Sequence, residues 1–402
     1  MINHRANNFD ALRFALATAV IFSHSYPLTR GESEAFEPLH WFSHGQIWIG
    51  AAAVNCFFII SGFLITQSWL RCRGLVDFFR KRVLRIYPGY LVNAAVCLLI
   101  VAPMAGADIH KIVSLKDGPR HILKAVLLRG VGLQAPLVKP DSSEAPQDLD
   151  AAPPRDPIQT NAFPTNPMPG ALNGSLWSIR FEFACYVLTP VIASIGLLKR
   201  RRWMVALTVA VLACQVALSI IDPFEGGMAE KGPRFASLHL LLRCMVLYFA
   251  GVLACLYEDR LPHGRGWAAA ALAAFVAAAL VPPAMMVVAP VALTFLVFWF
   301  AFEPRIGCQN FAKYGDFSYG IYLYAFPIQQ LLVMVAGPMQ PVTLFLATLA
   351  PTFAAAGASW FLVERPCLRL KSRAARPSTS LATPMVMDLS PVVGQPSIER
   401  QR

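Results

Sequence analysis

The sequence predicts an all-α protein, a polytopic membrane helix bundle of about ten transmembrane helices with both termini in the cytoplasm. Apolar residues make up 56% of the chain and charged residues only 14%, whereas soluble domains are about 45–50% apolar and about 25% charged. The apolar residues are grouped into segments long enough to cross a bilayer, which takes about 20 residues as a helix. Clusters of Lys and Arg lie between and after these segments.

The net charge is +12 and the chain holds nine cysteines. A basic chain can bind nucleic acid, but these Lys and Arg clusters fit the positive-inside rule better, so no nucleic-acid partner is expected. Every cysteine falls in a predicted span or in a basic loop that we place in the cytoplasm. The sequence therefore predicts no disulfide framework.

The first apolar segment, Asn8 to Pro27, contains two polar residues that a membrane helix should avoid, Arg13 and His24. We expect this segment to stay in the membrane as an uncleaved signal anchor. The two residues are eleven positions apart, which places them within about 20° of one helix face and roughly 16 Å apart along its axis. Asp10 falls near that face too. Ionisable groups inside a span mark a functional site by default, although Arg13 and His24 could instead extend to opposite interfaces.

The loop from Leu28 to Gly45 carries three acids and only Arg30 as a base, so we place it outside. His40 and His44 have the i, i+4 spacing of a helical metal pair. Because no third ligand accompanies them, no metal is assigned.

The second span, about Gln46 to Leu70, is interrupted near its middle by Ser61 and Gly62. The two small residues could be nothing more than a contact that lets two helices approach closely. The segment that follows, Arg71 to Arg85, holds six basic residues, which predicts a cytoplasmic loop and a cytoplasmic N-terminus.

That basic segment allows two interpretations. It could serve membrane orientation alone. Alternatively Arg82 and Arg85, spaced i, i+3 on one face, could clamp phosphate groups at the membrane surface.

The third predicted span, about Tyr87 to Ala107, returns the chain to the outside. The outer region that follows, residues 108–171, is expected to be partly irregular, with an amphipathic piece, His121 to Gln134, and a Pro/Ala/Asp-rich stretch, Ala135 to Pro169. The segment Ile122 to Leu137 is short and carries two bases, so it should lie on the membrane or re-enter it.

The fourth span, Leu172 to Leu198, contains Glu182 and ends in a basic run, Lys199 to Arg202, that marks the cytoplasm. Six further spans are predicted at Trp203 to Ile221, Ala236 to Leu256, Trp267 to Val281, Pro283 to Phe302, Phe317 to Ala336 and Val342 to Val363. Residues 1–370 thus form one membrane domain. Residues 371–402 are basic and then Pro/Ser-rich, which predicts a disordered cytoplasmic tail.

His24 and Glu182 are the acid and base candidates that this topology places in the outer half of the bundle. A His oriented by a carboxylate can take a proton from a hydroxyl, as acyl transfer requires. A phosphorylated acyl donor could bind at Arg82 and Arg85, extend along Arg13 and meet an acceptor alcohol at His24. The sequence does not decide whether Glu182 pairs with His24, with Arg180 or with Arg13.

Six segments in order resemble the acyltransferase 3 family of bacterial membrane O-acyltransferases, over nearly the whole length to about Arg369. They are FDALRFALATAVIFSHS, CFFIISGFLI, RKRVLRIYPGY, LWSIRFEFACYVLTP, FSYGIYLYAFPIQQ and FLVERPCLRL. The chain departs from the family at Ala325, where many members have His.

The resemblance implies transfer of an acyl group, commonly acetyl from acetyl-CoA, to a sugar hydroxyl of a surface glycan or related acceptor. It implies that His24 is catalytic and that Arg13 is essential near the donor. The residues that we assign on these grounds are His24, Arg13, Glu182 and Asp10 for catalysis, Arg82, Arg85, Ser61 and Tyr87 for donor binding, and Trp177, Tyr319 and Tyr322 for acceptor binding. The Ala at position 325 favours a single catalytic His.

The sequence therefore predicts an O-acyltransferase of the bacterial inner membrane, with acyl-CoA as co-substrate, no tightly bound cofactor, and a polysaccharide or glycolipid acceptor. Within this class, a small-molecule or peptidoglycan acceptor or a succinyl donor remains open. A rival class is a secondary transporter or exporter of a lipid-linked sugar. Transporters often show paired repeats with broken helices at matching positions, whereas the polar residues here sit in unlike motifs.

Overall fold

The computed structural model describes residues 7–31, 36–106, 123, 126–128, 162–222, 233–261, 264–337 and 339–373. Within these ranges every regular element is a helix. The longer ones are α1 (Phe9–Arg30), α3 (Ile49–Leu70), α4 (Leu75–Val96), α9 (Trp177–Ser194), α10 (Arg201–Ile221), α11 (Pro233–Leu256), α12 (Arg265–Ala279), α13 (Met285–Phe302), α14 (Ser318–Ala336) and α15 (Pro341–Ser359). Short pieces include α2 (Pro38–Phe42), α5 (Ala102–Met104) and α16 (Arg365–Arg373), and π-helical turns at Cys97–Val101 and Trp360–Glu364 extend α4 and α15.

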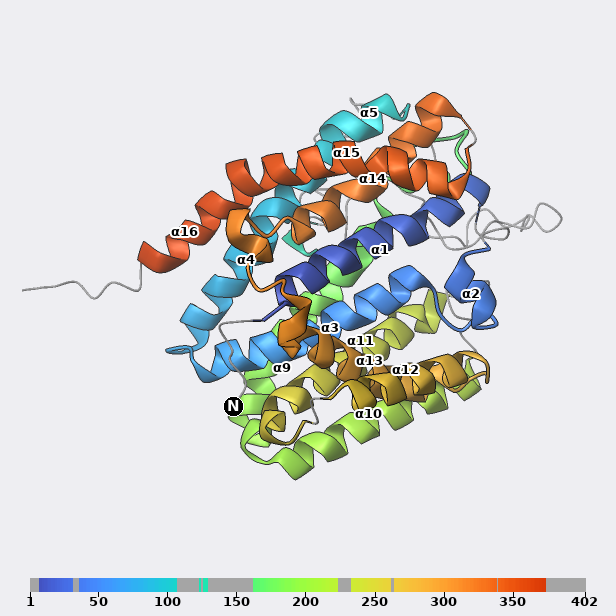
Figure 1. Cartoon of the computed structure of the whole chain (residues 1–402). Coiled ribbons are helices and arrows are strands. Elements are labelled where there is room, and N and C mark those ends of the chain that lie inside the picture. Colours follow the sequence, from blue (N-terminus) through green and yellow to red (C-terminus); the bar gives the residue numbers. More distant parts are fainter. Residues whose placement is uncertain are drawn as a thin grey trace, which may run out of the picture.

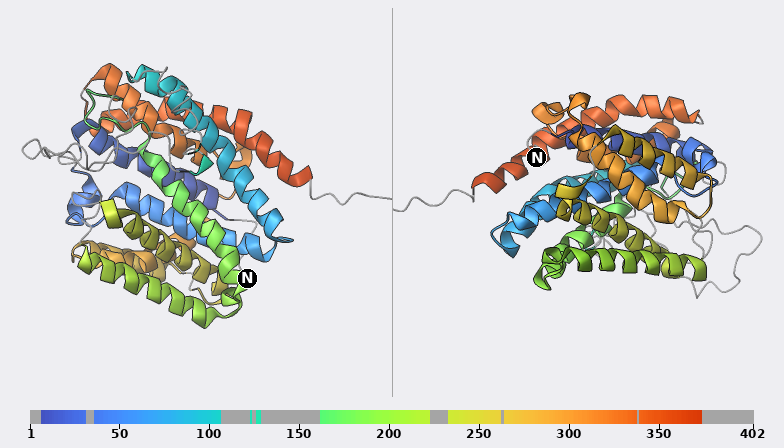
Figure 2. Two further views of the ribbon diagram at one scale, coloured as in Figure 1. Left: turned by 180° about the vertical axis from the view of Figure 1, so that it is seen from behind. Right: turned by 60° about the horizontal axis from the view of Figure 1, so that its bottom comes forward.

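These helices form one bundle in which α1 and α3 lie centrally. Helices α14, α15 and α4 lie on one side of them and α10, α12 and α13 on the other (Figures 1 and 2). The all-helical fold class is thereby confirmed for the described part of the chain. It is a multi-pass arrangement, since eight helical stretches there are long and apolar enough to cross a membrane.

Two further helices occupy the places of the remaining predicted spans. Helix α1 has 22 residues but is more polar than the eight, and α12 has only 15 residues. The count of ten spans and the cytoplasmic location of both termini stay predictions.

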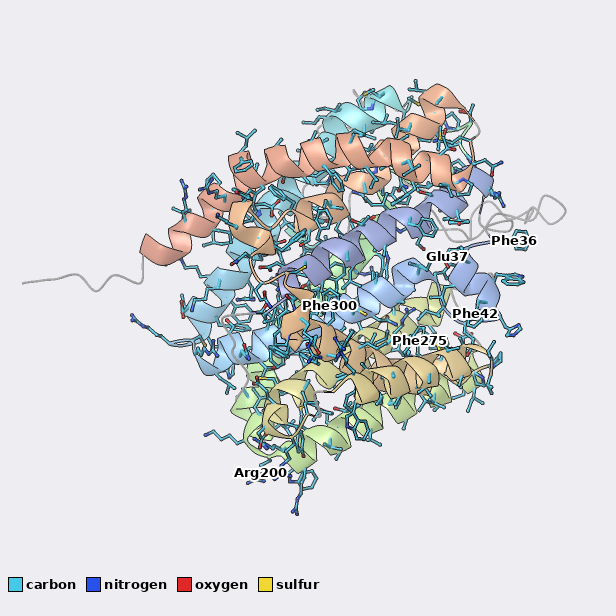
Figure 3. The ribbon with its side chains drawn as sticks, viewed as in Figure 1. Phe36, Glu37, Phe42, Arg200, Phe275 and Phe300 are labelled. Atoms are coloured by element: carbon cyan, nitrogen blue, oxygen red, sulfur yellow. The ribbon has the colours of Figure 1, made fainter. Side chains whose placement is uncertain are left out.

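The two ends of the bundle differ in charge. One end, here called the basic end, carries residues 71–85 and 199–202, and the other, the Glu37 end, carries α2. Figure 3 shows Glu37 and Phe42 at one end and Arg200 toward the other. Helix α1 begins at the basic end, where the Asn8 side-chain amide donates to the carbonyl oxygens of Phe300 (3.0 Å) and Glu303 (3.1 Å) at the end of α13.

The prediction of a loop up to the span at Tyr87 is wrong, because α4 begins twelve residues before Tyr87, at Leu75. Hydropathy indicates where a helix enters the bilayer, but not where the helix itself begins. Local contacts extend α4: Asp77 pairs with Lys81 one turn later at 2.6 Å, and the Phe78 ring packs edge-on against Trp69. Arg82 and Arg85 consequently lie on a helix that continues into the bundle.

Helices α3 and α11 approach each other through two glycines. A Cβ at Gly62 would lie 2.0 Å from the carbonyl oxygen of Tyr248, and a Cβ at Gly251 would lie 2.0 Å from that of Ile59. The close approach that small residues permit at Gly62 is therefore confirmed.

The described end of the predicted outer region, together with the first residues of the predicted fourth span, folds into the bundle against α14. Asn173 is fully buried, and its amide donates to the Asn93 side chain (3.1 Å) and to the Leu323 carbonyl (2.8 Å). Asn166 likewise donates to Gln330. Most of the predicted amphipathic and Pro-rich pieces, and all of the predicted tail after residue 373, lie outside the described residues.

Candidate active site

Three charged residues from distant parts of the chain meet near the basic end. The Asp316 carboxylate, just before α14, accepts from Arg85 on α4 and lies 3.5 Å from a guanidinium nitrogen of Arg13 on α1. The other carboxylate oxygen of Asp316 accepts from the backbone N–H (3.2 Å) and the hydroxyl of Ser318. One acid thus joins α1 and α4 to the beginning of α14.

The ionisation of Asp316 follows from this arrangement. Burial by itself raises the pKa of a carboxyl group, but the guanidinium groups of Arg85 and Arg13 and the hydrogen bonds outweigh that effect. The pKa of Asp316 therefore lies well below its usual value, and the residue is an anion at neutral pH.

Arg13 has a second acidic partner on its own helix. Its guanidinium donates to Asp10 at 3.0 Å, the i, i+3 relation that places Asp10 on the same face. The Asp10 side chain is 42% exposed and that of Asp316 only 13%. Arg13 is thus held in an ion-pair network with Asp10 and Asp316.

Arg82 and Arg85 diverge although they lie one turn apart on α4. Arg82 donates to the Ser68 hydroxyl at 3.2 Å and lies over the rings of Phe78 and Tyr186. Arg85 pairs with Asp316 instead, so the structure does not aim the two guanidinium groups at one shared partner. The Nε of Arg82 is buried and has no hydrogen-bond partner among the described residues.

Glu182 on α9 is the centre of a second polar group. It accepts hydrogen bonds from the Ser61 hydroxyl at 2.9 Å and from the hydroxyl of Tyr186. Ser61 is therefore a neighbour of Glu182, and the contacts of Glu182 join α3 to α9.

His24 lies closer to the Glu37 end. Its ring meets the Phe326 ring edge-on at 5.3 Å, its side chain is partly exposed, and its Nδ1 has no partner among the described residues. An imidazole with an unused ring nitrogen and some accessible area can exchange a proton with a bound molecule.

The structure does not place Glu182 beside His24, the first of the pairings that the sequence left open. A Cβ at Gly50 on α3 would touch Ser23, the neighbour of His24, whereas Ser61, which binds Glu182, is eleven residues further along α3. That separation is a rise of about 16 Å. Glu182 lies this deep because the segment before α9 already enters the bundle at Gly174, which meets Phe326.

The aromatic candidates are held by backbone and side-chain contacts. The Tyr319 hydroxyl donates to the Ile86 carbonyl (2.8 Å), and the centre of its ring lies 5.9 Å from the Arg85 guanidinium carbon. Tyr319 therefore lies beside Arg85 and Asp316 near the basic end. The Tyr322 hydroxyl bonds with Ser178 at 2.7 Å. Tyr87 donates to the Val126 carbonyl at 3.1 Å, and Trp177 is partly buried with its ring near Phe181.

Sequence reasoning missed Asp316. An acid two residues before a Ser that begins a helix is the available signal, because such an acid can accept the first backbone N–H groups. Ala325 is buried in a cluster with Ala17 and Ile21, so the position where many members have His here permits close contact between α14 and α1.

No three His, Cys, Asp or Glu side chains gather as a metal site would require within the described ranges. His40 stacks on Trp48 at 4.1 Å between ring centres. The polar groups instead form a series: Arg13, Arg85 and Asp316 near the basic end, Glu182 with Ser61 at mid-depth, and His24 toward the Glu37 end. Ionisable side chains inside a membrane helix bundle are by default candidates for a functional site.

Comparison with known proteins identifies the class. Residues 7–361 match the family described as an acyltransferase domain. The chain is 28% identical over 391 residues to nodulation protein 10 of Rhizobium leguminosarum bv. viciae, covering 92% of this chain and 95% of that protein. It is 26% identical over 378 residues to an O-acetyl transferase of Shigella phage Sf6, covering 92% and 98%. No solved structure matches the chain significantly. Because the family match spans nearly the whole described length, the chain belongs to the acyltransferase 3 family.

Proposed function

We propose that this protein is an O-acyltransferase of the bacterial inner membrane that moves an acyl group, acetyl in the simplest case, from cytoplasmic acyl-CoA to a hydroxyl of a surface or exported glycan. The observation that carries the proposal is the placement of Arg13 in an ion-pair network near the basic end and of His24 toward the Glu37 end of the same helix. Their separation of eleven residues, about 16 Å, requires an extended donor. The relative named O-acetyl transferase supports the reaction type.

In this proposal the basic end faces the cytoplasm and binds the phosphates of CoA, with Arg85 and Arg13 held in place by Asp316. The thioester extends along α1 toward His24. His24 takes the proton of the acceptor hydroxyl as its oxygen attacks the thioester carbonyl. The carbon–sulfur bond then breaks, and CoA leaves as the thiol after protonation, while the acceptor carries the new ester.

The test uses purified protein, acetyl-CoA and the deacylated glycan from the source cell surface, with release of free CoA as the readout. His24→Ala should lose on the order of 10² to 10⁴ in transfer rate while its thermal transition is retained. Asp259→Asn is the matched control, because that acid forms an exposed ion pair with Arg201. A His24→Ala protein with near-normal transfer would remove His24 from the mechanism, and glycan transport without CoA release would indicate a transporter.

Orientation is tested separately by thiol labelling of whole cells. In a cysteine-free background, Trp41→Cys at the Glu37 end, where the side chain is 71% exposed, should react with an impermeant reagent. A protein that keeps only Cys72, at the basic end, should react only after lysis. The reverse pattern would exchange the donor and acceptor sides.

A further inference from the structure

Arg243 is a cation inside the bundle that the mechanism above does not use. It lies on α11, six residues from the beginning of the apolar stretch Ser237–Leu256. Its Nε donates to the Asn55 side-chain oxygen at 3.1 Å, and one of its terminal nitrogens donates to the Ala51 carbonyl at 3.4 Å. Asn55 is itself buried, so both contacts fix the guanidinium against one face of α3.

Arg243 lies at about the depth of His24. Its partner Ala51 follows Gly50, the residue at which a Cβ would be 2.9 Å from the Ser23 hydroxyl, beside His24. Helices α1 and α11 both pack on α3, as Figure 1 shows. The guanidinium and the imidazole are therefore on two helices that both pack on α3, in the same half of the bundle.

The charge of Arg243 is not compensated within the described part of the chain. No Asp or Glu there forms an ion pair with it, in contrast to Arg13 and Arg85, which share Asp316. Of the five N–H groups of a guanidinium, only two are used by these contacts. The side chain is partly exposed, so the remaining N–H groups can reach a bound molecule.

An uncompensated cation in a membrane bundle is costly, because desolvation is offset only when an anion or several acceptors surround the charge. Asn55 holds Nε and Ala51 accepts from one terminal nitrogen, which leaves three N–H groups on the two terminal nitrogens. The planar guanidinium can then donate two parallel hydrogen bonds to a carboxylate or a phosphate.

We propose that Arg243 binds an anionic group of the acceptor, a carboxylate or a phosphate near the hydroxyl that receives the acyl group. Its relation to acyl transfer rests on the function proposed above, while anion binding itself does not. A neutral sugar would leave the guanidinium without its counter-ion, so the site discriminates against neutral acceptors.

The experiment measures binding rather than turnover, by isothermal titration of the purified full-length protein in lipid nanodiscs without acyl-CoA. The probes are D-glucuronate, D-glucose 6-phosphate and D-glucose, which share one ring and differ at carbon 6. The wild type should bind at least one anionic sugar about ten-fold or more tightly than glucose. Which anionic sugar binds more tightly distinguishes a carboxylate site from a phosphate site.

Substitutions of Arg243 and Asn55 test whether Arg243 is responsible for the preference for anionic sugars. Arg243→Met should remove the preference, Arg243→Lys should keep part of it, and Asn55→Ala should weaken it by releasing Nε. Arg201→Met, which removes an exposed arginine, should leave it unchanged. If Arg243→Met does not fold, Arg243→Lys and Asn55→Ala decide the question.

Equal binding of the three sugars by the wild type, or an unchanged preference in folded Arg243 variants, would overturn the proposal. His24→Ala should retain the preference, because it leaves Arg243 intact. A normal transfer rate in His24→Ala would therefore count against the proposed mechanism alone, and a lost preference in Arg243→Met would still establish the anion site.

Discussion

The guanidinium of Arg13 lies 3.5 Å from the carboxylate of Asp316, although 303 residues separate them in the chain. Arg85 binds the same carboxylate oxygen. Two arginines that the sequence assigned to different tasks, one near the donor in α1 and one in a phosphate clamp, are therefore held by one acid. Removing that acid would leave two neighbouring cations without their common partner.

Asp316→Asn should lower both stability and donor binding. Breaking a buried ion pair by removing one partner typically costs about 3–5 kcal/mol, reduced here because Arg13 and Arg85 are partly exposed. We expect a lower thermal transition and a higher KM for acyl-CoA, with partial recovery of both in Asp316→Glu. The exposed pair of Asp259 and Arg201 supplies the control, and Asp259→Asn should change neither quantity. An Asp316→Asn protein with wild-type KM would separate this acid from the donor site.

The pH dependence of that ion pair has a definite sign. Because the pKa of Asp316 is depressed in the folded protein, its contribution to stability is present above the ordinary carboxyl pKa. It is lost only as the pH falls through the lowered value. The difference in thermal transition between wild type and Asp316→Asn should therefore stay constant from neutral pH to about pH 5. A difference that disappears in this range would show that the carboxylate is protonated there.

Arg85→Lys tests whether the basic segment binds the donor or only orients the protein. Lysine keeps the charge but loses the planar fork that binds phosphate through two hydrogen bonds. The acyl-CoA KM should rise several-fold in Arg85→Lys and further in Arg85→Ala, with the glycan KM little changed, because binding remote from the reacting carbonyl is lost. Wild-type kinetics of Arg85→Lys at limiting acyl-CoA would mean that the donor is held elsewhere.

Glu182→Gln tests the separation between Glu182 and His24. The amide oxygen of Gln can still accept from both Ser61 and Tyr186, because both hydroxyls donate to the same oxygen of Glu182. Hydrogen bonds to an ionised acceptor are stronger than those to a neutral amide, so stability should fall by about 1–3 kcal/mol. The acidic limb of the kcat/KM pH profile should keep its midpoint. A midpoint that moves to lower pH would show that Glu182 acts on the His24 imidazole after all.

Gly62→Ala should strongly destabilise the contact between α3 and α11, because the new Cβ would lie 2.0 Å from the Tyr248 carbonyl oxygen. Gly357→Ala on α15 is the matched control, since a Cβ there meets nothing within 4 Å and helical Gly to Ala gains about 0.5–1 kcal/mol. Thermal unfolding of both variants in the same detergent measures the difference. Equal transitions would mean that α3 and α11 can separate without loss.

The amino-acid sequence was enough to predict the helical membrane class, the family and the presence of Arg13 and His24 on one helix face. These features are local. Transfer of apolar side chains into lipid depends on composition over about 20 residues, and the angle between two positions on one helix follows from its geometry. The bounds of α3, α10 and α13 agree within three residues with the predicted spans for the same reason.

Which charged side chains meet could not be predicted before the packing of the helices was known. The partner of Arg85 is Asp316 on another segment, Glu182 binds Ser61 rather than His24, and Arg243 is fixed by Asn55. Such contacts depend on the depth and rotation of each helix. These are set by packing between residues far apart in the chain, such as Gly62 against Tyr248. The sequence pattern shows which residues share one face of a helix, but it does not show which other helix that face will contact.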